Sequence, residues 1–224
     1  MSLYFGVFIS LFAYLFGMKL KNKFGWPVLN PLLVAIILVI AFLKATGISY
    51  TDYNTGASYI SYFLTPSTVC LAIPLYKQLE LLKKNLTAVA AAITAGVIGS
   101  VVSVYVMSMI FRLEHVHYVS LLPKSITTAI GMGVSEEAGG IVTMTIVSII
   151  LTGILGNIVA DGWFKLVGIK DPIAKGLALG TSAHAIGTAK ALELGEVEGA
   201  MSSLSIAVAG LMTVVAVPIM SGLL

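Results

Sequence analysis

Charged residues and cysteines are scarce in this sequence. Only 10% of its 224 residues are Asp, Glu, Lys or Arg, whereas a typical soluble domain has about 25%. Hydrophobic residues make up 58%, and the mean hydropathy is +1.01. Because one core in water cannot bury that much apolar surface, the composition excludes a soluble enzyme. It also excludes a disordered chain, which would have few apolar residues and many charges.

The single cysteine and the thin spread of basic residues exclude further classes. Cys70 has no partner for an internal disulfide, and no Cys/His spacing predicts a metal site or a cofactor. The net charge of +3 is too dispersed to form a nucleic-acid surface. The lysines at 19–23 follow the first apolar stretch, whereas those of a signal peptide precede it, so we expect a first span that is retained.

Long apolar runs dominate what the sequence does contain. A membrane-spanning helix needs about 20 apolar residues, so there is room for seven or eight spans. Runs such as LLVAIILVIAF lack the alternation of barrel strands, and we therefore expect an all-α polytopic protein of the lipid bilayer. The apolar segments are 2–18, 28–46, 58–76, 86–111, 119–135, 141–160, 173–191 and 199–224.

Three of these segments are interrupted by proline, glycine or polar residues, namely 58–76, 119–135 and 173–191. Broken backbone at membrane depth is tolerated only inside protein or beside a water-filled cavity. We therefore expect kinked or re-entrant regions that line an interior site near the bilayer midplane. The interruptions include Pro66, Pro74, Pro123, Lys124, Gly131, Gly133, Gly176, Gly180 and Gly187.

The order of segments also predicts a repeat. Residues 65–68 and 181–184 are each followed by a charged turn and then by a long span rich in small residues. Such placement favours an inverted repeat, residues 1–112 and 113–224, within one membrane domain. The alternative is that any membrane protein with eight segments can be divided into two similar halves by chance. Residue identity between the two halves is low.

The lysine-rich loops predict the orientation of the chain. The positive-inside rule places the loops at 19–23 and 77–84 in the cytoplasm. The basic loop at 165–175 would face outside if all eight segments crossed. A segment between 112 and 141 that fails to cross brings this loop inside as well.

Lys124 is the first candidate for chemistry. It lies in the stretch LPKSITT, where Ser125, Thr127 and Thr128 add three hydroxyls to an apolar segment. A proline at the start of a helix, the free N–H groups there and a lysine together favour an anion. The alternative is that Lys124 extends to the membrane interface.

Glu136 and Glu137 form a carboxylate pair between glycines. They are candidates for binding a coupling cation or sharing a proton. The alternative is a solvated turn. No nucleophile or metal-ligand set accompanies them, so we predict no catalytic site.

The stretch GTSAHAIGTAK at 180–190 is the most informative in the chain. His184 and Thr188 share a helix face, and a histidine can exchange protons near neutral pH. We expect both to face a substrate cavity, with His184 as a proton carrier; a structural hydrogen-bonding role is the alternative. The predicted substrate-binding set is Thr65, Ser67, Thr68, Lys124, Ser125, Thr127, Thr128, Thr181, Ser182, His184 and Thr188.

Three stretches carry a family resemblance: LTPSTVCLAIPLYKQLELLKKN, LLPKSITTAIGMGVSEEAGGI and ALGTSAHAIGTAKALELGEVEGAMSSLSIAVAGLMT. They resemble the LrgB/CidB membrane proteins, described as antiholin-like and related to a plastidal glycolate/glycerate translocator. Ala129 departs from the family pattern, which has proline after the paired threonines.

The resemblance implies a transporter of small monocarboxylates such as glycolate, glycerate or pyruvate, in the inner membrane of a bacterium. It implies alternating access, proton coupling, homo-oligomers and a separate LrgA/CidA-type partner. The alternative is an antiholin-like pore or regulator that controls murein hydrolases and autolysis.

Overall fold

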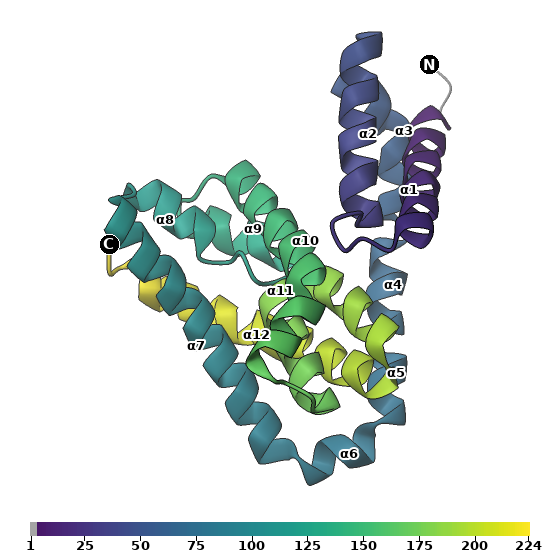
Figure 1. Cartoon of the computed structure of the whole chain (residues 1–224). Coiled ribbons are helices and arrows are strands. Elements are labelled where there is room, and N and C mark those ends of the chain that lie inside the picture. Colours follow the sequence, from purple (N-terminus) through teal and green to yellow (C-terminus); the bar gives the residue numbers. More distant parts are fainter. Residues whose placement is uncertain (1–3) are drawn as a thin grey trace. The chain divides into compact units, whose positions relative to one another are not determined.

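The computed structural model describes residues 4–224, apart from the side chains of residues 64, 65 and 68. Every regular element in this part of the chain is a helix. The chain divides into two compact units, Met1–Cys70 and Leu71–Leu224 (Figure 1).

The first unit consists of four helices. They are α1 (Phe5–Phe24), α2 (Pro31–Thr46), α3 (Tyr50–Ser61) and α4 (Leu64–Cys70). Asn30 caps α2 by accepting hydrogen bonds from the N–H groups of Leu32 and Leu33, and Gly25 ends α1 at φ 66°. A Cβ on Gly6 would collide with the carbonyl oxygen of Tyr53, so glycine is needed where α1 crosses α3.

The second unit contains three membrane-length helices among five shorter or broken ones. The long helices are α7 (Leu86–Phe111), α10 (Val142–Val167) and α12 (Glu196–Ser221), each of 26 residues. At 1.5 Å per residue each is about 39 Å long, enough to cross a bilayer. The others are α5 (Ala72–Lys77), α6 (Leu79–Lys84), α8 (His115–Leu121), α9 (Thr128–Glu137) and α11 (Pro172–Leu194). These apolar helices, with α2 as a shorter one, confirm an all-α membrane protein.

The helices α7 and α12 run in the same direction, as Figure 1 shows. Tyr118 Oη donates to the carbonyl of Met220 at 2.8 Å, so α12 ends beside α8, just after α7 ends. Glu196 at the start of α12 shares a pocket with Lys77, shortly before α7 begins. We call the two ends of this unit the His115 end and the Lys77 end. The long helix α10 begins at the His115 end, since the N–H of Ile141 donates to Ser120 Oγ of α8 at 2.7 Å.

The helix α11 folds back on itself at His184, whose backbone is at φ 41°, ψ −134°. In the first arm, a Cβ on Gly180 would lie 2.6 Å from Ser205 Cβ of α12. In the second arm, Thr188 Oγ1 lies 2.7 Å from Ser202 Oγ of the same helix. A Cβ on Gly187 would meet the carbonyl oxygen of Leu179, so the two arms touch. The first arm therefore begins at the Lys77 end, and the second arm returns to that end. The helix α11 is a re-entrant hairpin.

A second hairpin enters from the His115 end. It consists of α8, a non-helical stretch at 122–127, and α9. Its base is held by Thr145 of α10, whose Oγ1 lies 2.8 Å from the Ser120 carbonyl and 2.6 Å from Ser135 Oγ. At its tip, Ser125 reaches Ser100, close to the middle of α7. Two hairpins thus enter the unit from opposite ends.

The predicted interruptions are present. Segment 173–191 is broken at His184, segment 119–135 at 122–127, and segment 58–76 is divided among α3, α4 and α5. The predicted non-crossing segment between 112 and 141 corresponds to the α8–α9 hairpin. The division into repeats 1–112 and 113–224 stays a prediction.

Candidate functional site

The tip of the α8–α9 hairpin holds a half-buried cation. Lys124 Nζ donates to Ser125 Oγ at 3.1 Å, and Ser100 of α7 donates to the same oxygen at 2.9 Å. Ser125 is only 6% exposed. Within the described part of the chain no carboxylate forms an ion pair with Lys124. Its charge is therefore open to an external anion.

The start of α9 adds further positive character beside Lys124. Thr127 caps this helix with extended backbone, and its carbonyl accepts from the N–H of Gly131 at 2.8 Å. The first N–H groups of a helix, which here begin at Thr128, have no acceptor within the helix and attract negative charge. Thr127 and Thr128 are both half-buried. The predicted group Lys124, Ser125, Thr127 and Thr128 thus lies together at one hairpin tip.

His184 lies at the tip of the α11 hairpin and is only 3% exposed. Its Nε2 is 2.9 Å from the carbonyl of Ile149 in α10, and because a carbonyl only accepts, Nε2 must carry the proton. Thr188 Oγ1 lies 3.0 Å from the carbonyl of His184. Both side chains are buried in protein and hold the hairpin, and their predicted contact with a substrate stays a prediction.

Ile149 links the two hairpins. Its carbonyl accepts a hydrogen bond from His184 of α11. A Cβ on Gly131 of α9 would lie only 2.5 Å from Ile149 Cδ1, so α9 packs closely against this side chain. On α7, a Cβ on Gly96 would lie 2.9 Å from Thr181 Oγ1, one turn before Ser100. The region between the hairpins is therefore lined by the middle parts of α7 and α10.

Thr181 and Ser182 line a cavity of about 430 Å³ between α7, α10 and α11. Thr181 Oγ1 donates to the carbonyl of Leu177 at 2.7 Å, and Ser182 Oγ to that of Ala178 at 2.6 Å. Since both protons are already used within the helix, these hydroxyls offer a ligand only their lone pairs. Unlike Lys124, they have no proton left to donate to an anion.

The predicted carboxylate pair is not brought to the hairpin tip. Glu136 and Glu137 are exposed at the C-terminal end of α9, at the opposite end of that helix from Lys124. Ser67 is exposed in α4 of the first unit, and the side chains of Thr65 and Thr68 lie outside the described residues. The described residues contain no group of three metal-ligating side chains.

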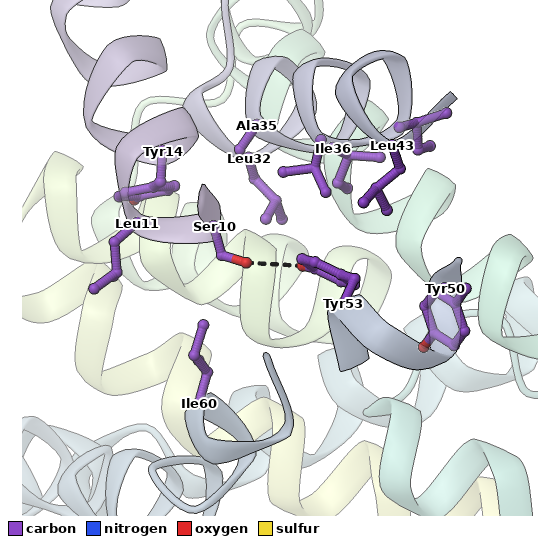
Figure 2. A pocket seen from close by; sticks show the side chains of 12 residues that line it. Ser10, Leu11, Tyr14, Leu32, Ala35, Ile36, Leu43, Tyr50, Tyr53 and Ile60 are labelled. Atoms are coloured by element: carbon purple, nitrogen blue, oxygen red, sulfur yellow. Dashed lines mark hydrogen bonds between the residues drawn. The ribbon is translucent and has the colours of Figure 1, made fainter. Parts of the chain in front are cut away.

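A pocket of about 410 Å³ opens among α1, α2 and α3 of the first unit. Figure 2 shows leucine and isoleucine side chains around it, with Ser10 and Tyr53 pointing toward each other. Their hydroxyl oxygens are 2.8 Å apart, so these polar groups satisfy one another. An apolar pocket of this kind does not suit a small carboxylate.

Three contributors to the candidate site were not predicted, namely Ser100, Ser202 and the carbonyl of Ile149. Gly96 and Ser100 are small residues four apart in apolar α7, and such a pair indicates close helix packing. A backbone carbonyl leaves no signal in a sequence.

Comparisons with known proteins give one family. Residues 10–223 match the LrgB-like family. The antiholin-like protein LrgB of Bacillus mycoides is 43% identical over 219 residues, which cover 97% of this chain and 95% of that protein. The antiholin-like protein LrgB of Bacillus subtilis is 44% identical over 220 residues, covering 98% and 95% respectively. No solved structure gives a significant match.

Proposed function

The chain belongs to the LrgB-like family, and from that premise we propose that it is an antiholin-like membrane protein that controls murein hydrolase activity and autolysis. The observation that carries the proposal is its near full-length similarity to relatives that bear this name. The relatives' names favour this function over carboxylate transport, the function that the family resemblance of the sequence implies.

The rate of autolysis of the host cell tests directly whether the protein controls murein hydrolases. Deleting the gene should raise murein hydrolase activity and speed detergent-induced lysis, because an antiholin restrains lysis. The wild-type gene should reverse both effects. Unchanged hydrolase activity and lysis rate in the deletion strain would contradict the proposal.

Translocation of a small monocarboxylate is the second candidate, and Lys124 favours it. This lysine is half-buried, and no carboxylate in the described chain pairs with it. Two serine hydroxyls and the start of a helix lie beside it, and together these groups suit a carboxylate ligand. Glycolate, glycerate and pyruvate all have this group and differ by a few atoms. No catalytic step is involved, and we propose that the protein is not an enzyme.

The opposed hairpins suggest how such a ligand would move. One tip carries Lys124 and the other carries His184, and both reach the middle parts of the long helices. Movement of either hairpin would open the space between them to one end of the unit, which is the requirement for alternating access. Proton coupling would use His184 Nδ1, because Nε2 is held by Ile149.

The location of the protein and its partner chain are also proposals. We place the protein in the inner membrane of a bacterium as a homo-oligomer, acting with an LrgA-type partner chain. Co-purification of that partner from detergent-solubilised membranes tests the association.

Uptake into proteoliposomes separates the two candidates. A translocator should take up labelled glycerate with saturation and should prefer one enantiomer. A pore should show uptake that rises linearly with concentration for both enantiomers. Absence of uptake with intact control of autolysis would leave the regulatory function alone.

A further inference from the structure

The end of α10 and the start of α11 form a pocket that neither candidate function uses. Its volume is about 370 Å³, and it lies at the Lys77 end of the second unit. The turn is tightly built: Gly168 adopts φ 77°, and the N–H of Ile169 donates to the carbonyl of Phe164 at 2.9 Å. Both sides of the pocket are therefore held in place by the connection itself.

Lysines dominate the rim of this pocket. Lys165, Lys170 and Lys175 line it together with one carboxylate, that of Asp161. Asp161 Oδ2 is already 2.7 Å from Lys190 Nζ of α11. No other ion pair to these three lysines occurs within the described residues. Because the only carboxylate in the described lining is paired with Lys190, the pocket carries a net positive charge.

The position of two of these lysines is unfavourable unless an anion is bound. Lys175 lies in the first turn of α11, and Lys170 directly precedes its N-cap residue, Asp171. The positive end of a helix disfavours cations. Asp171 offsets only part of this, since its carboxylate accepts from the N–H of Ala174 at 2.9 Å. A phosphate among the lysines would relieve the remaining repulsion.

The position of the pocket along α10 indicates the level where a bilayer meets water. It is formed at the last turn of α10, a helix of membrane-spanning length. Trp163 in that turn is 58% exposed, and tryptophan is enriched at the membrane interface. The lining of the pocket also includes three apolar side chains, those of Phe164, Ile169 and Leu194. A ligand that is anionic at one end and apolar at the other fits this surface.

We propose that this pocket binds the headgroup phosphate of an anionic phospholipid such as phosphatidylglycerol. Basic pockets between transmembrane helices recognise lipids of this class. The lysines bind the phosphate, and the apolar side chains of the lining contact the glycerol backbone and the start of the acyl chains. The bound lipid neutralises the base of the α11 hairpin, where both of its arms end.

Fluorescence of Trp163 tests the proposal at the site. The chain has two tryptophans, so Trp26→Phe leaves Trp163 as the only reporter. In vesicles that contain brominated lipids, phosphatidylglycerol should quench Trp163 at lower mole fractions than phosphatidylcholine does. Replacing Lys165, Lys170 and Lys175 by Gln should abolish this preference, because each lysine near an anionic surface contributes up to about fivefold.

A matched variant and a competitor complete the test. Lys77→Gln/Lys83→Gln/Lys84→Gln removes the same charge from another turn and should keep the preference for phosphatidylglycerol. Equal quenching by both lipids in the parent, or an undiminished preference after Lys165→Gln/Lys170→Gln/Lys175→Gln, would overturn the proposal. Displacement of the brominated lipid by millimolar inorganic phosphate would also overturn it, because the site would then bind free phosphate.

Discussion

Lys124 and His184 occupy the tips of opposing hairpins but differ in what holds them. Lys124 has a single hydroxyl partner, and the described chain offers it no carboxylate. His184 is almost fully buried, and its Nε2 is committed to the Ile149 carbonyl. The lysine is thus available to a ligand, whereas the imidazole stabilises the turn in which it lies.

We predict that Lys124→Ala weakens carboxylate transport through substrate affinity. Losing a charge-assisted hydrogen bond to an anion should cost roughly 1.5–3 kcal/mol, or about 10–150-fold in the half-saturating concentration. Concentration-dependent uptake into proteoliposomes measures it. Lys83→Ala, at the end of α6, serves as a control and should leave the half-saturating concentration unchanged. An unchanged value for Lys124→Ala would mean that this lysine only extends to the interface.

His184→Gln should abolish pH-driven accumulation but leave substrate exchange partly intact. Glutamine keeps a donor for the Ile149 carbonyl yet does not titrate. Accumulation under an imposed pH gradient and exchange without a gradient are the two measurements. His117→Gln in α8 is the matched control. If the His184→Gln variant still accumulates substrate, the proton is carried elsewhere, and Glu136 and Glu137 are the next candidates.

At the scale of elements, the breaks were predictable but the fold-back was not. Proline and glycine interrupt a helix whatever surrounds them, so segments 119–135 and 173–191 could be identified as broken. No pattern, however, tells how far the chain turns at a break. The turn in α11 occurs at His184, at a positive φ that glycine would tolerate better, rather than at Gly180 or Gly187. Packing against α12 decides the outcome.

Gly180→Ala should loosen the first arm of α11 from α12. The added Cβ would lie 2.6 Å from Ser205 Cβ and collide with the Ser202 carbonyl, which should cost about 1–3 kcal/mol of stability. Gly99→Ala in α7 is the matched control, because a Cβ there meets no heavy atom within 4 Å. Thermal unfolding in detergent should show a lower midpoint for Gly180→Ala alone. Equal midpoints would contradict the close packing of α11.

The depth of the α8–α9 hairpin can be tested by cross-linking. In a Cys70→Ser background, the pair Ser100→Cys/Ser125→Cys should form a disulfide in native membranes, because the two hydroxyl oxygens lie 2.9 Å apart. The pair Ser108→Cys/Ser125→Cys should not, since Ser108 lies two turns further toward the His115 end of α7. Cross-linking of the second pair alone would show that the hairpin stops short of the middle.

For the whole molecule, composition was sufficient for the fold class. The apolar runs predicted an all-α membrane protein, and three 26-residue apolar helices confirm it. The number of crossings was harder to predict, because segments 119–135 and 173–191 are long enough to be counted as spans, whereas α8–α9 and α11 return to the end from which they enter. The site was predicted where it carries charge, as at Lys124. It was missed where the partner is a backbone carbonyl, as at Ile149.

The central claim is that α11 is re-entrant, and the sidedness of its two ends tests it most directly. In a Cys70→Ser background, Lys170→Cys and Glu196→Cys each place a thiol at an exposed end of this hairpin, and Glu114→Cys places one at the His115 end. A membrane-impermeant maleimide should label the Lys170 and Glu196 variants from the same side and the Glu114 variant from the other. Labelling of the Lys170 and Glu196 variants from opposite sides would show that α11 crosses the membrane, and the two-hairpin architecture would be wrong.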